Sequence, residues 1–184
     1  KALPHFHIPL QSGSDRILKL MKRRYSKKYY INLIKNVRHL LPNACIGVDV
    51  IVGFPTESER DFNDTYTLVK NMDISYLHVF PYSDRENTIA QKFLQKVKRN
   101  IKIDRRNTMR LLSSKKYNNF ILNNIGCIKE VLFEKYSEGI LSGWTNNYIK
   151  VNIKGSKDLL NSIRKVQLVE IIDNSINGIL INEA

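Results

Sequence analysis

The sequence predicts an α/β unit built on three parallel strands, followed by a small all-β barrel. Strand-like and helical segments alternate over residues 1–90, a basic helical connector covers residues 91–125, and five short β-like runs separated by turn residues fill residues 126–184. Alternation of strands with helices implies right-handed crossovers and a parallel sheet, whereas short strands with frequent turns are typical of antiparallel barrels. We therefore expect a domain at 1–90, a connector at 91–125 and a second domain at 126–184.

The first elements follow from cap residues and apolar spacing. Residues 5–11 predict a strand, and the turn after it leads into a helix that Ser14 or Asp15 caps. A second helix runs from Ser26 to Pro42, because its apolar side chains recur at helical spacing.

Residues 45–54 form a nearly continuous β-branched run, which predicts a strand buried on both faces. Asp49 is its single carboxylate. Thr56 and Glu59 have the spacing of a capping box for the next helix, and residues 75–83 predict a third strand. The later β-like runs are 127–136, 141–145, 147–153, 166–172 and 176–182.

The charge of +13 is confined to one part of the chain. Residues 1–125 contain 23 Lys and Arg against 10 Asp and Glu, whereas residues 126–184 contain seven of each. A basic surface attracts phosphate backbones, so a nucleic acid is the expected partner, although solvated basic helix faces would give the same pattern. No apolar run approaches the roughly 20 residues needed to span a bilayer, so we expect no membrane partner and a cytoplasmic protein.

The cysteines and histidines predict no metal site. Cys45 and Cys127 lie far apart in apolar stretches, which suits buried, unreactive thiols in a reducing compartment. His5 and His7 share a strand face, but no acid or cysteine near them in sequence completes a ligand set. Hydrogen-bonded histidines at the core or rim are the preferred interpretation.

A ligand site is expected where the three strands end, because parallel α/β folds bind ligands at the carboxyl edge of the sheet. Polar and glycine residues follow each strand, at 11–14, 53–57 and 81–85. A carboxylate such as Asp49 can accept hydrogen bonds from ribose hydroxyls, and Arg23 can hold a carboxylate. Asp49 could equally accept backbone N–H groups in a structural role.

A second site is predicted in the all-β unit, where residues 143–151 interleave aromatic, amide and basic side chains. Such a surface suits single-stranded RNA, and the candidate residues are Trp144, Asn147, Tyr148 and Lys150. The alternative is that Trp144 and Tyr148 close the core of the barrel.

Three segments, residues 7–15, 21–25 and 49–57, together resemble the radical S-adenosylmethionine methylthiotransferases, and residues 126–184 resemble their RNA-binding TRAM domain. Residues 78–83 are most similar to the branch that methylthiolates N6-threonylcarbamoyladenosine at position 37 of tRNA. The branches acting on isopentenyladenosine-tRNA and on a ribosomal protein are the nearer alternatives.

This resemblance implies that residues 1–90 are the C-terminal half of a partial TIM-type barrel that holds S-adenosylmethionine. The matching cofactor residues are Gln11, Ser12, Arg23, Asp49, Gly53 and Tyr82. It assigns Arg23 to the methionine carboxylate, Asp49 to the ribose, and the loops of Gly53 and Tyr82 to the adenine and sulfonium surroundings. Two [4Fe–4S] clusters would serve the full-length protein, one to form a 5′-deoxyadenosyl radical and one to supply sulfur.

The chain departs from the family pattern at two places. The CxxxCxxC triad and the second cluster's cysteines are absent, so the resemblance implies a C-terminal fragment that is inactive alone and holds no catalytic residue. Asn87 stands before Thr88 where the family usually has glycine. A non-catalytic RNA-binding adaptor is the rival interpretation, while the sulfur and electron donors cannot be predicted.

Overall fold

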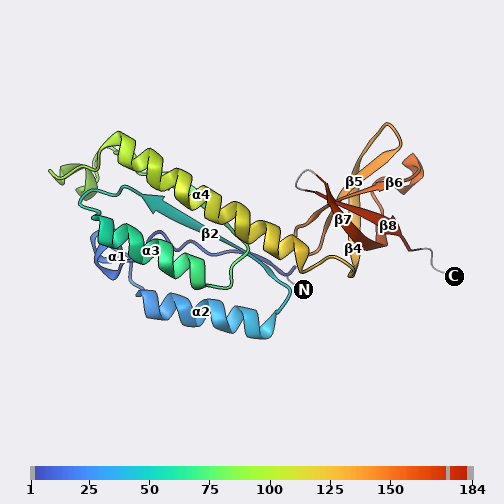
Figure 1. Ribbon diagram of the computed structural model, residues 1–184, viewed down its shortest axis with the longest axis horizontal. Coiled ribbons are helices and arrows are strands. Elements are labelled where there is room, and N and C mark those ends of the chain that lie inside the picture. Colours follow the sequence, from blue (N-terminus) through green and yellow to red (C-terminus); the bar gives the residue numbers. More distant parts are fainter. Residues whose placement is uncertain (1–2, 173–174, 182–184) are drawn as a thin grey trace. The chain divides into compact units, whose positions relative to one another are not determined.

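The computed structural model describes residues 3–172 and 175–181 (Figure 1). These residues form two compact units, one spanning Phe6–Lys116 and the other containing the described residues from Tyr117 onward together with residues 3–5. The elements of the first part are β1 (His5–His7), α1 (Asp15–Leu20), α2 (Lys27–Leu40), β2 (Cys45–Val52), α3 (Glu59–Asn71), β3 (Tyr76–Pro81), a 3₁₀ turn (Ile89–Lys92) and α4 (Arg99–Leu122). The later ones are β4 (Ile128–Ser137), β5 (Ile140–Thr145), β6 (Lys150–Lys154), a 3₁₀ turn (Lys157–Leu159), β7 (Ile163–Ile172) and β8 (Ser175–Leu180).

The first unit contains the expected three-stranded parallel sheet, in the order β1-β2-β3. Strands β2 and β3 pair in parallel from Gly47–Tyr76 to Val52–Pro81. The regular part of β1 is shorter than expected, because after His7 the chain keeps contact with β2 only through single hydrogen bonds and a parallel bridge between Gln11 and Val50. All three strands therefore bring their carboxyl ends to the same edge.

The two faces of this sheet differ in what covers them. The buried residues Ile46, Val48, Val50 and Val52 alternate along β2 and pack with apolar side chains of α2, α3 and α4, which run beside the strand in Figure 1. Because successive side chains of a strand point to opposite faces, Asp49 and Ile51 lie on the other face, where both are only partly buried. The prediction that this strand is buried on both faces was wrong for that end of β2.

Of the three helix caps predicted in the first unit, two are confirmed. Ser14 caps α1 and Ser26 caps α2, each through its hydroxyl. The expected capping box at Thr56 and Glu59 was wrong, since α3 begins two residues later with Ser58 as N-cap and Asp61 as its partner. Thr56 instead has a φ of 69°, so the chain makes an additional turn before the helix.

Asp61 also bonds to residues at the start of α1, so its replacement tests how much these contacts stabilise the first unit. Its carboxylate also accepts hydrogen bonds from the hydroxyl of Ser14 and from the guanidinium of Arg16. Burial alone would raise the pKa of Asp61, but the hydrogen bonds from Arg16, Ser58 and Ser14 outweigh it and hold that pKa well below its usual range.

Replacing Asp61 by asparagine is expected to lower the free energy of unfolding by about 2 kcal/mol at neutral pH. A lowered folded-state pKa stabilises the fold above the carboxyl's ordinary value near pH 4, and that contribution disappears as the pH falls through the folded-state pKa. Urea titrations of both proteins between pH 3 and 7 measure it. A difference that does not shrink toward low pH would contradict the ionic explanation.

The second unit is a small barrel, closed in the order β4-β5-β6-β8-β7. The expectation of an antiparallel barrel was wrong for one pairing, because β6 and β8 pair in parallel, whereas the other neighbouring strands pair antiparallel. Five β-like runs were predicted and five strands are observed, the last ending at Leu180 rather than at residue 182, which lies outside the described residues. Its core consists of Ile121, Val131, Phe133, Leu141, Ile149, Val151, Ile153, Val166, Leu168 and Ile176. Neither Trp144 nor Tyr148 belongs to this core.

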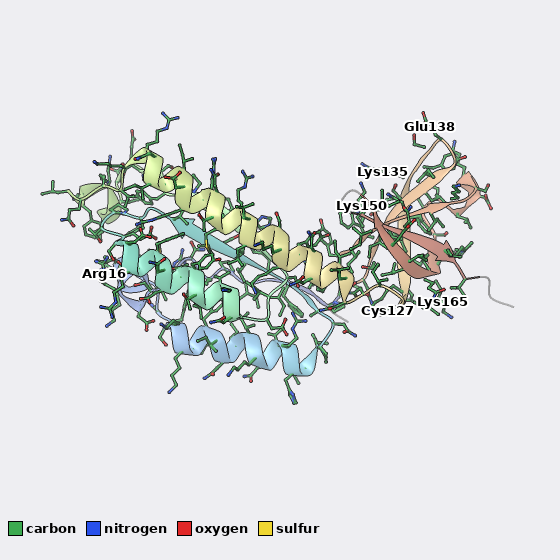
Figure 2. The ribbon with its side chains drawn as sticks, in the orientation of Figure 1. Arg16, Cys127, Lys135, Glu138, Lys150 and Lys165 are labelled. Carbon is green, nitrogen blue, oxygen red and sulfur yellow. The ribbon has the colours of Figure 1, made fainter. Side chains whose placement is uncertain are left out.

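The predicted burial of Cys127 was wrong. Cys45 lies inside the first unit, where burial raises the pKa of its thiol to about 11, but Cys127 is exposed immediately before β4 (Figure 2). It occupies the link between α4 and the barrel, where the apolar pattern of the strand has not yet begun. Among the helices of the described residues, none has the length and apolarity needed to cross a bilayer.

Candidate functional site

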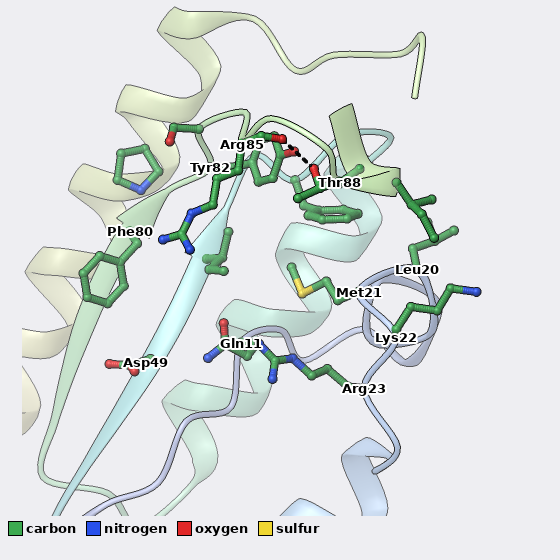
Figure 3. A pocket seen from close by; sticks show the side chains of 16 residues that line it. Gln11, Leu20, Met21, Lys22, Arg23, Asp49, Phe80, Tyr82, Arg85 and Thr88 are labelled. Carbon is green, nitrogen blue, oxygen red and sulfur yellow. Dashed lines mark hydrogen bonds between the residues drawn. The ribbon is translucent and has the colours of Figure 1, made fainter. Parts of the chain in front are cut away.

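A cavity of about 660 Å³ opens at the carboxyl edge of the three-stranded sheet (Figure 3). Four of the six predicted cofactor residues line it, namely Gln11, Arg23, Asp49 and Tyr82. Phe54 and Phe80 add apolar surface from the ends of β2 and β3. The cavity therefore combines apolar walls with a few polar groups, as is usual for sites that hold a small molecule.

Gln11 enters the cavity from a strained position. Its φ is 69°, its N–H donates to the carbonyl of Asp49 at 2.8 Å, and its carbonyl accepts from the N–H of Ile51 at 2.9 Å. Non-glycine residues in left-handed conformations cost free energy and persist where surrounding contacts determine them, often at ligand sites. These two bonds to β2 hold Gln11 beside the cavity.

Asp49 has a partner that the sequence did not predict. The Nε2 atom of His7 lies 2.8 Å from the carboxylate oxygen Oδ1 of Asp49. The ring of His7 also lies 5.2 Å from that of His78, so the three side chains share the open face of the sheet. Two-residue spacing placed His7 on a strand face, but only strand pairing brings it to Asp49. One carboxylate oxygen is thus fixed, and among the described residues no side chain bonds to the other.

Two arginines extend toward the cavity from different loops, Arg23 after α1 and Arg85 after β3 (Figure 3). Within residues 3–172 and 175–181, neither guanidinium has a hydrogen bond or an ion pair to another side chain. A guanidinium that keeps all its donors available is suited to bind a carboxylate or a phosphate in two-point fashion.

Ser12 and Gly53 do not line the cavity, although both lie at its edge of the sheet. The hydroxyl of Ser12 is buried and lies 3.3 Å from that of Thr65 in α3, so Ser12 joins α3 to the strand end. Gly53 has a φ of 73°, and its N–H donates to Glu57 at 2.7 Å. Both residues therefore support the loops that carry the cavity side chains.

Tyr82 forms one wall of the cavity. Its N–H donates to the carbonyl of Val52 at 2.8 Å, which continues the pairing of β2 with β3 beyond the strand end. The ring lies edge-on to Phe54 at 5.2 Å, and the ammonium of Lys102 lies 5.3 Å from its centre. Burial is the main cause of the raised pKa of Tyr82, so its hydroxyl stays protonated at neutral pH.

Asn87, which stands where the family usually has glycine, has a φ of 62°. Asparagine tolerates this left-handed conformation far better than branched residues do, so the loop keeps a glycine-like shape. We expect Asn87→Gly to leave the free energy of unfolding within a few tenths of a kcal/mol, and Asn87→Val to lower it by about 1 kcal/mol. Urea unfolding of the two variants measures this, and equal effects would contradict a conformational role.

The four predicted RNA-binding residues lie in or beside one turn of the barrel. The rings of Trp144 and Tyr148 stack with centroids 4.5 Å apart, and Trp144 pairs directly across the strands with Lys150. Tyr148 is 47% exposed. Asn147 is buried instead, and its amide bonds to Thr145 and Asn124.

The residues of this chain fit S-adenosylmethionine but not an iron–sulfur cluster. Such clusters are usually held by three or four cysteine thiolates, whereas the sequence has two cysteines, of which Cys45 is buried with a raised pKa. The described residues contain no group of three or more metal-ligating side chains. By contrast, Arg23 and Asp49 supply the free donors and the carboxylate that an amino acid and a ribose require.

Comparison with known proteins identifies relatives of this chain. A model of the radical SAM superfamily matches residues 1–69. The chain is 43% identical to "Threonylcarbamoyladenosine tRNA methylthiotransferase MtaB" of Aquifex aeolicus over 89% of its length, and 37% identical to the protein of the same name in Bacillus subtilis over 92%. It is also 36% identical over 97% of its length to "tRNA-2-methylthio-N(6)-dimethylallyladenosine synthase" of Bacillus mycoides.

The chain spans 39% of the length of the first two relatives and 36% of the third. Among solved structures, it resembles coproporphyrinogen III oxidase (HemN) of Escherichia coli with a TM-score of 0.53 and 12% identity, over 78% of this chain and 41% of that one. This likeness supports the fold alone. The superfamily match and the relatives together show that this chain is similar to the radical S-adenosylmethionine methylthiotransferases.

Proposed function

We propose that the protein containing this chain is a cytoplasmic tRNA methylthiotransferase that acts on N6-threonylcarbamoyladenosine at position 37. The chain would supply part of the S-adenosylmethionine site and part of the tRNA-binding surface. When bound, S-adenosylmethionine supplies the radical and methyl chemistry of this family. The cluster ligands would lie in residues outside this chain, and the chain alone would be inactive.

The observation that carries this proposal is the convergence of Gln11, Arg23, Asp49 and Tyr82 on one cavity at the carboxyl edge of the sheet. These residues come from segments up to about 70 positions apart, so a scaffold without a ligand would have no reason to gather them. Within the cavity, Arg23 would bind the methionine carboxylate. The free oxygen of Asp49 would accept a hydrogen bond from the ribose, while His7 orients the carboxylate.

The substrate assignment is supported by the relatives named for threonylcarbamoyladenosine, which are 43% and 37% identical to this chain. A second candidate is the dimethylallyladenosine-modified tRNA, because relatives named for that substrate are 34–38% identical. The barrel is proposed to be a TRAM-like domain in which Trp144, Tyr148 and Lys150 contact RNA, while Asn147 holds their turn.

The test is to express the complete protein in a bacterium that lacks both tRNA methylthiotransferases, then to measure tRNA nucleosides by mass spectrometry. Methylthiolated threonylcarbamoyladenosine is the expected product. Methylthiolated isopentenyladenosine would support the second candidate instead. Modification of a ribosomal protein, or tRNA binding with no modified nucleoside, would refute the proposed activity.

A further inference from the structure

The first turns of α4 contact both loops that carry the cavity walls. The guanidinium of Arg105 donates to Glu57 through Nη1 at 2.6 Å and to Glu59 through Nη2 at 3.0 Å. Lys102 donates to the carbonyl of Tyr82 at 3.0 Å. Helix α4 was expected to be a basic connector, yet these two bases face the first unit rather than solvent.

Glu57 connects Arg105 to the turn that follows β2. The same carboxylate oxygen that accepts from Arg105 also accepts the N–H of Gly53 at 2.7 Å. The side chains of Glu57 and Arg105 are only 2% and 7% exposed. A buried carboxylate needs its cation, because removing one partner of a buried pair leaves an uncompensated charge. Burial raises the pKa of Glu57, and Gly53 and Arg105 oppose that rise.

The turn held in this way is conformationally strained. Gly53 has a φ of 73°, which glycine adopts without strain, whereas the β-branched Thr56 has a φ of 69°, which costs free energy. Phe54, which lies between them, is 4% exposed and lines the cavity. A Cβ atom on Gly53 would lie 2.4 Å from Cγ of Lys102, so the stem of this lysine closes over the turn. Strained turns persist only where their surroundings determine them.

We propose that Arg105 is a positioning residue of the S-adenosylmethionine site, acting through Glu57 to fix the turn at Gly53 and the Phe54 wall. Lys102 supports the same site by covering Gly53 and binding the Tyr82 loop. This inference rests on the proposed function only for the identity of the ligand. The dependence of the turn on Arg105 is a property of the ligand-free protein.

The experiment uses the complete protein with reconstituted clusters and compares Arg105→Gln with a matched control, Arg110→Gln. Arg110 lies on the same helix and is exposed, and its guanidinium bonds to no side chain among the described residues. Hydrogen exchange measured by mass spectrometry follows the amides of Gly53, Phe54, Thr56 and Glu57, and calorimetry gives the dissociation constant for S-adenosylmethionine. We expect Arg105→Gln to speed exchange in this turn at least roughly tenfold, leave the amides of β2 protected, and weaken binding about tenfold. Arg110→Gln should change neither quantity.

Arg105→Lys provides a second measurement, because lysine keeps the positive charge but loses the two-armed contact to Glu57 and Glu59. Its exchange should lie between those of the wild type and Arg105→Gln. If Arg105→Gln does not fold, the exchange rate of the turn in Arg105→Lys tests the proposal instead. A rate equal to that of the wild type would overturn it. Exchange that rises equally in Arg110→Gln also overturns it. A wild-type protein that binds no S-adenosylmethionine refutes the proposed function, while the exchange data still test the role of Arg105.

Discussion

Replacement of Asp49 by alanine is expected to weaken S-adenosylmethionine binding roughly 10- to 100-fold, because a hydrogen bond to a charged acceptor is worth about 1.5–3 kcal/mol. His7 already fixes one oxygen of this carboxylate at 2.8 Å, so the group is oriented before the ligand arrives. Preorganisation of this kind removes an entropic cost from binding. Calorimetry on the complete protein with its clusters reconstituted measures the change.

Two further variants separate the role of Asp49 from general effects. His7→Phe removes the orienting contact but keeps an aromatic ring, so we expect a smaller loss of affinity than for Asp49→Ala. Asp64→Asn removes an exposed carboxylate from α3 and should leave affinity unchanged. The affinity for tRNA should stay nearly constant in all three variants, because the carboxylate of Asp49 affects only the groups that bind within the cavity. Equal losses for both ligands in Asp49→Ala would contradict the assignment to the ribose.

Periodicity and cap chemistry were sufficient to predict the order of the elements in both units. Ser14 and Ser26 cap their helices because their hydroxyl oxygens accept the N–H groups of Ile17 and Tyr29, which have no partner within the helix. The capping box at Thr56 was wrong for a reason outside local sequence. The N–H of Thr56 bonds to the carbonyl of Gln95, and its carbonyl accepts from Arg16, so contacts with distant segments set the turn.

For the candidate site, the sequence pattern predicted the location, at the carboxyl edge of the sheet, but not the contacts within it. Strand order placed Gln11, Asp49 and Tyr82 near one another, and the cavity contains all three. The contact of His7 with Asp49 depends on the pairing of β1 with β2, which no local pattern encodes. Arg105 lay inside a run of ten bases between residues 92 and 116, and its sequence context does not distinguish it from solvated neighbours such as Arg110.

Charge likewise predicted a basic surface without showing which bases compose it. Several bases within residues 16–38 and 92–116 have structural partners. Arg38 contacts Asp73, and Lys116 donates to the carbonyl of Met72, where burial lowers the pKa of Lys116. Others, such as Lys28 and Arg110, remain exposed. The surface available to phosphate groups is therefore smaller than the count of bases implies, so the proposed tRNA binding would depend more on aromatic contacts in the barrel.

The double substitution Trp144→Ala with Lys150→Ala is expected to weaken tRNA binding roughly 30-fold or more. Stacking of a base on an aromatic ring is worth about 1–3 kcal/mol, and the lysine adds one phosphate contact. Trp144 and Lys150 pair across β5 and β6, so both act at one place on the barrel. The turn from Thr145 to Ile149 is internally bonded, which keeps the ring of Tyr148 stacked on Trp144.

A matched control for this pair is Lys154→Ala, which removes the same charge from the same strand at a position paired with Ile140. It should change tRNA affinity little, and S-adenosylmethionine affinity should not change in any of these variants. Removal of Lys150 should also reduce the slope of log tRNA affinity against log salt concentration by about one, the change expected for one lost phosphate contact. If the double variant unfolds the barrel, the rings serve its packing. If it stays folded and binds tRNA as the wild type does, RNA binding by Trp144 and Lys150 is excluded.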